Sequence, residues 1–495
     1  HGTHVASVAA GRPNTYTTAP DLTGIAPNAN VYDVKVLDNQ GFGTLSDAIE
    51  GIQWVIYHAK EYNIRVMNLS IAMDSTDSWQ DDPLCIAARS AVAQGIVVVV
   101  AAGNFGKNQF GTENYGTITS PANDPSVITV GSANPRGTAT RVDDVVNGFS
   151  SRGPTRGSYI DSLGVRRPDN LLKPDLVAPG NAIVAAAATQ ASSTLPTWNT
   201  LATLHYAPLV SATGIVQAYG ETQMQMSGTS VAAPVVSGSA AVLLQANPGL
   251  TPALVKAILQ YTAQPIAGAN LLQQGAGLVN LNGAVALAKV IRSDVKEMIA
   301  AGTLSAGANL LAPNKTLPPR SSTLNNQSFN WSRVVFMGGN RVVTGDALFT
   351  KYQPIYNPRY TWARGVVLDR YADYWDATTK QFPYWFWEFR AGNVPLLTSG
   401  VIEGTAMLGN SSAAARTGVF TLTPTVSGWF VAGSGVVLSE GVVLSEGVVL
   451  SEGVVLSEGV VLSEGVVLSE GVVLSEGVVL SEGVVLSEGL VLGER

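Results

Sequence analysis

The apolar run from Ile96 to Ala102 (Ile-Val-Val-Val-Val-Ala-Ala) constrains the fold more than any other segment. Such β-branched residues favour a strand, and a strand that is apolar on both faces has to be covered on both faces. Residues 82–94 before it carry apolar side chains at helical spacing, and the two patterns alternate over residues 1–290. We therefore predict a three-layer α/β domain with a mostly parallel sheet between helices.

Local signals place the individual elements. Residues 45–62 have apolar side chains at helical spacing, and Thr44 just before them suits an N-cap. His1 is followed by small residues that suit a short, closely packed helix. Helices are also expected at 82–94, 230–245, 252–262 and 282–291, and strands at 30–37, 64–70, 96–102, 127–130 and 176–177.

Composition excludes several classes of protein. The chain has 495 residues, of which 46% are hydrophobic and 13% charged, so it can bury a large core and form more than one domain. The sequence has no basic patch, which argues against a nucleic-acid partner. No apolar run is long enough to span a membrane, and the single Cys85 excludes an internal disulfide.

The sequence changes character after residue 290. Residues 291–330 gather Pro, Asn and Ser, which is typical of a helix end followed by a linker. Residues 331–434 hold six of the nine tryptophans, and we expect a small β-rich region there. These side chains either pack in a core or form a carbohydrate- or surface-binding face. They are Trp331, Trp362, Trp375, Trp385, Trp387 and Trp429.

Residues 435–495 consist of hexapeptide repeats. The sequence Gly-Val-Val-Leu-Ser-Glu occurs nine times from Gly435 to Glu488 and is followed by one altered copy. Because six is an even number, each repeat puts its Val and Leu on the same faces as the last, which favours a β-solenoid. The ten glutamates of this tail argue against tight stacking, so a disordered or aggregation-prone tail stays open. We expect the tail to mediate surface attachment or self-association.

Three separated segments carry the parts of an acyl-transfer site. They are the His-Gly-Thr-His at residues 1–4, the Ala-Ala-Gly-Asn at residues 101–104 and the Ser-Gly-Thr-Ser at residues 227–230. A histidine can act as a base near neutral pH. A serine after small residues at a helix start admits a substrate, and the helix N–H groups there face developing negative charge. Pro234 is expected in the first turn of that helix, where its missing N–H costs little.

Each segment also has a simpler interpretation. His1 and His4 could be metal ligands on one helix face, with a third ligand from His58 or His205. His58 lies on an amphipathic helix, where a structural role is the more common one. Asn104 alone could cap or turn the chain, and a Gly-Thr-Ser alone is usually a turn.

The three segments, in this order, resemble the subtilisin-like serine proteases, the subtilases. Further segments look like those of the family, including Gly24-Ile25-Ala26-Pro27, residues 149–154 and residues 173–180, so the resemblance spans residues 1–290. It implies a serine endopeptidase that acts on polypeptides through an acyl-enzyme on Ser230. His1 would be the general base and acid, and Asn104 would donate its amide to the oxyanion.

The resemblance also implies where a substrate binds. In the family an extended substrate pairs with two backbone edges, which correspond here to Gly41-Phe42-Gly43 and Ser70-Ile71-Ala72. Gly41, Gly43, Ser70, Ile71 and Ala72 are therefore the expected substrate-binding residues. Ala72 stands where the family usually has Gly, so the main specificity pocket is expected to be narrower.

The chain departs from the family pattern at the catalytic acid. Subtilases carry Asp, His and Ser in that order, and no residue precedes His1 here. Asp175 lies between His1 and Ser230, but in a family segment without a catalytic role. We therefore expect the chain as given to be impaired as a protease. The alternative is a non-catalytic surface or adhesion protein on a degenerate protease domain.

The family resemblance implies a secreted or cell-surface protein that requires no cofactor. Structural calcium is common among subtilases, although residues 12–24 match the expected loop poorly. No metal ligands are assigned from the sequence.

Overall fold

The computed structural model describes residues 1–12, 23–38, 41–160, 163–164, 166–188, 223–336 and 342–363, followed by short strands as far as residue 493. Its core is a five-stranded sheet in the order β1-β2-β3-β4, with β7 also pairing with β3. The parallel strands are β1 (Val66–Leu69), β2 (Val97–Ala101), β3 (Ile128–Asn134) and β7 (Leu176–Pro179), and β4 (Val145–Val146) is antiparallel to β3.

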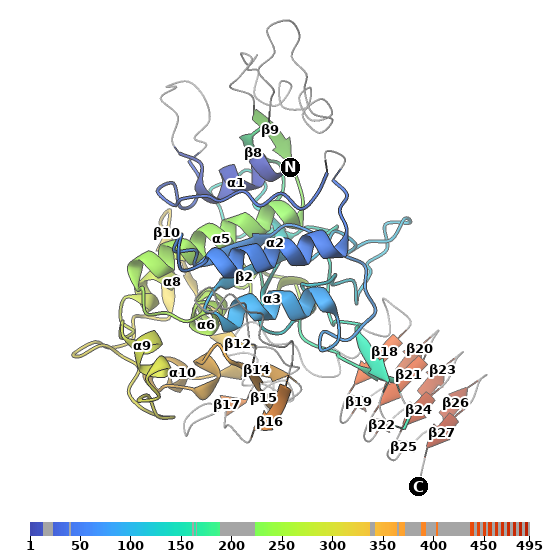
Figure 1. Cartoon of the computed structure of the whole chain (residues 1–495). Helices are drawn as coiled ribbons and strands as arrows, with labels where there is room; N and C mark the ends of the chain where they lie inside the picture. The colour runs from blue at the N-terminus through green and yellow to red at the C-terminus, as the bar shows by residue number, and fades with distance from the viewer. Residues whose placement is uncertain are drawn as a thin grey trace, which may run out of the picture.

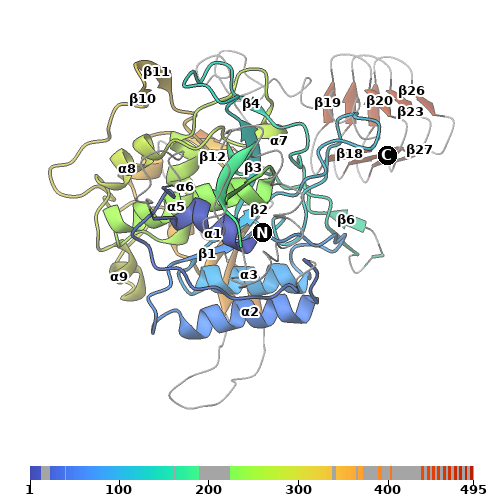
Figure 2. The same cartoon turned by 90° about the horizontal axis from the view of Figure 1, so that it is seen from above.

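Strand β2 lies at the centre of the molecule because both of its faces are apolar. Val97, Val99 and Ala101 point into the core cluster beneath α5 (Thr229–Ala246), α6 (Pro252–Thr262) and α8 (Leu281–Ala288). Val98 and Val100 point into the cluster beneath α2 (Leu45–His58) and α3 (Pro83–Ala93). This alternation produces the predicted layers of helix, sheet and helix (Figures 1 and 2).

The helices begin where the sequence indicates. Thr44 forms a capping box with Asp47 at the start of α2, as predicted. The Asp82 carboxylate accepts hydrogen bonds from the Leu84 and Cys85 amides at 2.9 and 3.1 Å and thereby caps α3. Both helices lie within the predicted ranges.

The predicted strand at residues 30–37 is wrong. These residues pair with no strand that the structure describes, although the Val34 side chain packs against the α2–α3 cluster. Alternating valines show the propensity for a strand, but a strand also needs a partner for its backbone groups. Within the described residues β1 likewise pairs only with β2, so its other edge stays free.

The chain beyond residue 290 packs against the α/β core. Trp331, Val335 and Tyr356 belong to the same buried cluster as Leu254 of α6 and Leu287 of α8. Residues 331–336 and 342–356 therefore contribute to this core, and the predicted domain boundaries stay predictions. The other elements to residue 403 are α1 (Gly2–Ala10), β5 (Ser158–Ile160), β6 (Arg166–Pro168), β8 (Ile183–Ala186), β9 (Gln223–Met226), α7 (Leu271–Gln274), α9 (Val295–Ala300), β10 (Ser321–Leu324), β11 (Gln327–Asn330), β12 (Val334–Val335), β13 (Val343–Thr344), α10 (Ala347–Thr350), β14 (Tyr360–Ala363), β15 (Val366–Tyr371), β16 (Glu388–Gly392) and β17 (Ile402–Glu403).

In the repeats, the structure describes short strands from β18 (Val436–Ser439) to β27 (Val491–Gly493). Each of the first seven strands pairs in parallel with the strand eighteen residues further on, as in Val436 opposite Val454. Every third strand therefore shares a sheet. The predicted β-solenoid stays a prediction, because only these strands are described.

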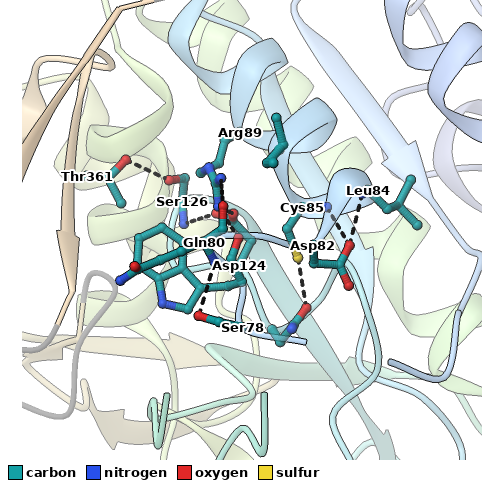
Figure 3. A network of polar contacts seen from close by, with 12 residues as sticks. Ser78, Gln80, Asp82, Leu84, Cys85, Arg89, Asp124, Ser126 and Thr361 are labelled. Atoms are coloured by element: carbon teal, nitrogen blue, oxygen red, sulfur yellow. Dashed lines mark hydrogen bonds and ion pairs between the residues drawn. The ribbon is translucent and has the colours of Figure 1, made fainter. Parts of the chain in front are cut away.

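A buried polar network anchors α3 to its surroundings (Figure 3). The Arg89 guanidinium forms an ion pair with Asp124 at 3.0 Å and donates a hydrogen bond to the Gln80 carbonyl. The Ser126 hydroxyl lies 3.2 Å from the Thr361 hydroxyl, which links the network to the C-terminal part of the chain. Because both charges of the Arg89–Asp124 pair are buried, loss of one would leave the other without compensation.

One described helix, α5, is long and apolar enough to cross a membrane. Its 18-residue window is 72% buried inside the protein, so it is the central helix of the fold.

Candidate active site

Ser230 occupies the second position of α5, directly after the backbone turn at Gly228. A Cβ atom built on Gly228 would lie 3.1 Å from Ser230 Oγ, 3.7 Å from the Ser230 nitrogen and 3.6 Å from Asn104 Nδ2. These three polar atoms therefore surround one small space, which any larger residue at position 228 would fill. The structure brings the predicted nucleophile and the predicted oxyanion donor together.

Asn104 follows the C-terminal end of β2, after Gly103 with φ of +105°. Its Oδ1 accepts hydrogen bonds from the Thr229 amide at 2.9 Å and the Thr229 hydroxyl at 3.0 Å. The Gly103 amide in turn donates to that hydroxyl at 3.2 Å. With Oδ1 held by these donors, the Nδ2 amide faces the space beside Ser230. Thr229 was missed in the sequence, where it is only the middle residue of a common tripeptide.

Pro234 lies inside α5, and its predicted place in the first turn is wrong. A proline has no N–H, so the carbonyl four residues earlier, that of Ser230, receives no helical hydrogen bond from it. The Ser70 hydroxyl donates to this carbonyl at 2.8 Å. The proline thus leaves the nucleophile's carbonyl available for a bond from the adjoining strand end.

Ser70 is itself held by a chain of side chains. The Ser237 hydroxyl donates to Asn68 Oδ1 at 2.8 Å, and Asn68 Nδ2 donates to the Ser70 hydroxyl at 2.9 Å. This chain joins β1 to the third turn of α5 and holds the Ser70 hydroxyl against the Ser230 carbonyl. Asn68 and Ser237 were also missed, because nothing local in the sequence connects residues so far apart.

His1 is the N-cap residue of α1, and α1 runs beside α5. Val8 of α1 shares a cluster with Val231, and a Cβ on Gly238 would lie 2.8 Å from the Ala9 carbonyl oxygen. Ala9 lies eight residues after His1, and Gly238 lies eight residues after Ser230. Eight residues are about 12 Å along a helix. Both helices therefore begin at the same end of the molecule, where Figure 1 places the N-terminus near the end of β9.

The second histidine of the motif anchors α1. His4 is fully buried, and its Nε2 lies 3.0 Å from the Ile183 carbonyl oxygen of β8. A ring nitrogen that faces a carbonyl carries the proton and is not available to a metal. The His58 Nδ1 lies 2.8 Å from a carboxylate oxygen of Glu61, and His205 lies outside the described residues.

No group of three His, Cys, Asp or Glu side chains suitable for a metal occurs among the residues that the structure describes. The predicted calcium loop falls mainly on residues 13–22, which lie outside them.

The two predicted substrate edges differ. Ile71 and Ala72 follow β1, and none of the described hydrogen bonds occupies their backbone groups. Gly41 and Gly43 flank a turn in which Asp38 binds both the amide and the carbonyl of Phe42. The edge at Ile71 and Ala72 is therefore open to a pairing strand. In the edge at Gly41–Gly43, the backbone amide and carbonyl of Phe42 already form hydrogen bonds with Asp38. Gly43 also borders a cavity of about 820 Å³ between residues 34–44 and α2, which is not lined by Ser230, Asn104 or His1.

His1 has no carboxylate partner within the described residues. Asp175, the one candidate between His1 and Ser230, is buried between Lys173 at 2.8 Å and Lys256 at 2.9 Å. Its carboxylate also accepts the Thr129 amide at 2.7 Å. Burial lowers the pKa of Lys256 to about 7, against the opposing effect of Asp175. Asp175 therefore serves a structural cluster.

Comparison with known proteins identifies the family of the chain. The model of the subtilase family matches residues 1–285. Serine protease AprX of Bacillus subtilis is 36% identical over 290 residues, which are 58% of this chain and 57% of that protein. Subtilisin E of the same species is 31% identical over 284 residues, which are 57% and 55%. Fervidolysin from Fervidobacterium pennivorans, a keratinolytic enzyme related to subtilisin, aligns in structure with a TM-score of 0.40 and 27% identity, covering 57% of this chain and 35% of that one.

The chain thus spans little more than half the length of the curated relatives it matches. The family match covers more than half of the chain and includes all three segments of the site. This chain belongs to the subtilase family of serine proteases.

Proposed function

We propose that the protein is a serine endopeptidase with Ser230 as nucleophile, His1 as general base and acid, and Asn104 as a donor to the oxyanion. The observation that carries this proposal is the shared space in front of Gly228, which Ser230 Oγ, the Ser230 amide and Asn104 Nδ2 border together. One nucleophile and two hydrogen-bond donors around a single point match what acyl transfer requires.

In the proposed reaction, Ser230 Oγ attacks the carbonyl carbon of a peptide bond and passes its proton to His1. The Ser230 amide and Asn104 Nδ2 donate to the oxyanion of the tetrahedral intermediate. The amine leaves with the proton from His1, and an acyl ester remains on Ser230. Water then repeats the sequence with His1 again as base, which releases the acid and restores the serine.

A fluorophosphonate probe on the full chain tests this proposal. We expect a single adduct on Ser230, located by peptide mass mapping, and no adduct in Ser230→Ala. Ser227→Ala is the matched control, because the Ser227 hydroxyl only accepts a hydrogen bond from the Ala182 amide. If the native chain and Ser227→Ala both fold normally but the native chain resists the probe, a non-catalytic surface or adhesion protein becomes the better proposal.

We also propose that the carboxylate partner of His1 arrives on a strand that pairs with the free edge of β1. Support comes from β1, which lies beside Ser70 and has no second partner among the described strands. Replacing the corresponding Asp in trypsin costs about 10⁴ in turnover. A version of the chain extended by such a strand with its Asp should therefore react with the probe up to about 10⁴-fold faster, and equal rates would contradict the idea.

Substrate pairing at Ile71 and Ala72, an extracellular location and a β-solenoid tail for self-association belong to the same proposal. The parallel pairing of repeats eighteen residues apart favours the solenoid. Light scattering of the full chain against one that ends at residue 434 tests the last point. Equal masses would argue against association through the tail.

A further inference from the structure

We propose that Ser151 is a positioning residue that holds Asn104 in place for the oxyanion, an inference that rests on the proposed function. Ser151 lies in the segment Phe149–Gly153, distant from Asn104 in sequence. Its side chain is completely buried.

Two hydrogen bonds bracket Asn104. The Ser151 amide donates to the Gly103 carbonyl at 3.0 Å. The Phe105 amide donates to the Ser151 hydroxyl at 3.1 Å. Ser151 therefore fixes the peptide units on both sides of Asn104, and these units set the direction in which the Asn104 side chain leaves the backbone.

The fit around Ser151 is close. A Cβ on Gly103 would lie 2.7 Å from the Ser151 hydroxyl, so glycine at 103 lets the two segments approach. The Gly106 amide continues the contact by donating to the Phe149 carbonyl at 2.9 Å. Further along, the Thr117 amide donates to the Arg152 carbonyl at 2.9 Å. The segment Phe149–Gly153 thus supports both ends of the loop that begins at Asn104.

Asn104 needs this support because the rest of its surroundings fix only its side-chain oxygen. Thr229 holds Oδ1, and the residue itself is exposed. A donor that points at a developing charge helps only if it is already in position. The backbone clamp by Ser151 and the side-chain clamp by Thr229 together determine where Nδ2 lies.

The neighbouring Ser150 supplies a matched control. It is equally buried, and its hydroxyl accepts the Ser132 amide of β3 at 2.9 Å, away from Asn104. Ser150→Ala and Ser151→Ala remove the same atom from adjacent buried positions. Similar losses of thermal stability are expected from both, whereas only Ser151→Ala should change the chemistry.

The decisive experiment is a double-mutant cycle on the full chain, read as the rate of fluorophosphonate labelling of Ser230. Ser151→Ala should slow labelling about tenfold, because an unsatisfied amide loosens the loop. In the Asn104→Ala background the same change should have no further effect, since Ser151 acts through Asn104. Ser150→Ala should label at nearly the native rate. Equal slowing by Ser151→Ala in both backgrounds, or equal slowing by both serine variants, would overturn the inference.

Hydrogen exchange separates this inference from the proposed function. The Phe105 amide should exchange slowly in the native chain and in Ser150→Ala, and much faster in Ser151→Ala. If native protein resists the probe but shows this exchange pattern, the enzyme proposal fails and the clamp on the Asn104 loop stands. If the Phe105 amide exchanges equally in all three proteins, the clamp is refuted whatever the labelling shows.

Discussion

The two sides of the candidate site are held in different ways. On the nucleophile side, Ser230 and Asn104 are tied by hydrogen bonds to Thr229, Ser70 and, through the backbone, Ser151. On the other side, His1 caps α1 without a side-chain hydrogen bond and has no ion pair among the described contacts. Its place depends on the packing of α1 against α5. The comparison shows that hydrogen bonds hold the candidate oxyanion donor in position, whereas the predicted base is held only by the packing of its helix.

Asn104→Ala should produce the largest loss. Removal of the corresponding donor from a subtilisin costs about 10²–10³ in turnover, and a similar decrease in labelling of Ser230 is expected here. Asn108→Ala, in the following turn, is the control and should keep the native rate. A loss below about threefold would mean that the nucleophile side is less organised than the hydrogen bonds indicate.

His1→Ala should cost less than Asn104→Ala. In subtilisin the loss of the acid costs about 3 × 10⁴ and the loss of the base about 2 × 10⁶, so a base without its acid is worth only about 10². We expect the labelling rate to fall by that factor or less. A loss as large as 10⁵ would show that His1 already has an acid partner and would remove the difference between the two sides.

The pH dependence of folding has to be known before any pH profile is assigned to His1. Burial gives Lys256 a pKa of about 7 in the folded protein, against an ordinary value of 10.5. Between these values the unfolded chain binds more protons, so the free energy of unfolding should rise with pH, by up to about 3 kcal/mol from pH 7 to 9.5. Below pH 7 the destabilising charge is fully present.

Urea unfolding at a series of pH values measures this effect. Lys256→Met should flatten the rise, because the methionine side chain fills similar space without titrating. Buried tyrosines such as Tyr261, whose pKa is raised by burial, should act in the opposite direction only above about pH 10. An unchanged slope in Lys256→Met would assign the rise to other groups.

Pro234→Ala should have the smallest effect. The new N–H would compete with the Ser70 hydroxyl for the Ser230 carbonyl. Because the two donors would share one acceptor, each hydrogen bond would be weakened by about 1 kcal/mol. Labelling should slow by about fivefold with little change in melting temperature. Pro252→Ala, at the first position of α6, is the control, because no hydrogen bond to a neighbouring segment depends on it. A native rate in Pro234→Ala would argue against a role for the Ser70 contact.

The sequence predicts best those features that depend on residues close together in the chain. Thr44 and the valines of β2 act through their own neighbours, and both predictions are confirmed. The strand at 30–37 failed because its propensity says nothing about a partner. Pro234 was misplaced because it is the fifth residue even of the predicted helix 230–245, and the sixth of α5, so it lies beyond the first turn.

Other features of the site lie beyond any local pattern. Ser151 reaches Phe105 across 46 residues, and Ser70 reaches Ser230 across 160. Each contact forms only after sheet and helices have assembled, so the motifs indicated the candidate nucleophile and the candidate donor but not the residues that hold them. Thr229 could have been found from its motif, had its hydroxyl been considered as a partner for the neighbouring strand end.

The packing of residues 331–336 and 342–356 in the same core as α5 has a consequence for how the protein is made. Tyr356 is completely buried in the cluster beneath α5, yet it is translated long after Ser230. Translation proceeds at about 5–20 residues per second, so the last packing partners of the helix that carries Ser230 are made on the order of ten seconds after it. A shortened chain that ends where the family match ends would lack them permanently, so recombinant versions should extend beyond Tyr356 to yield well-folded material.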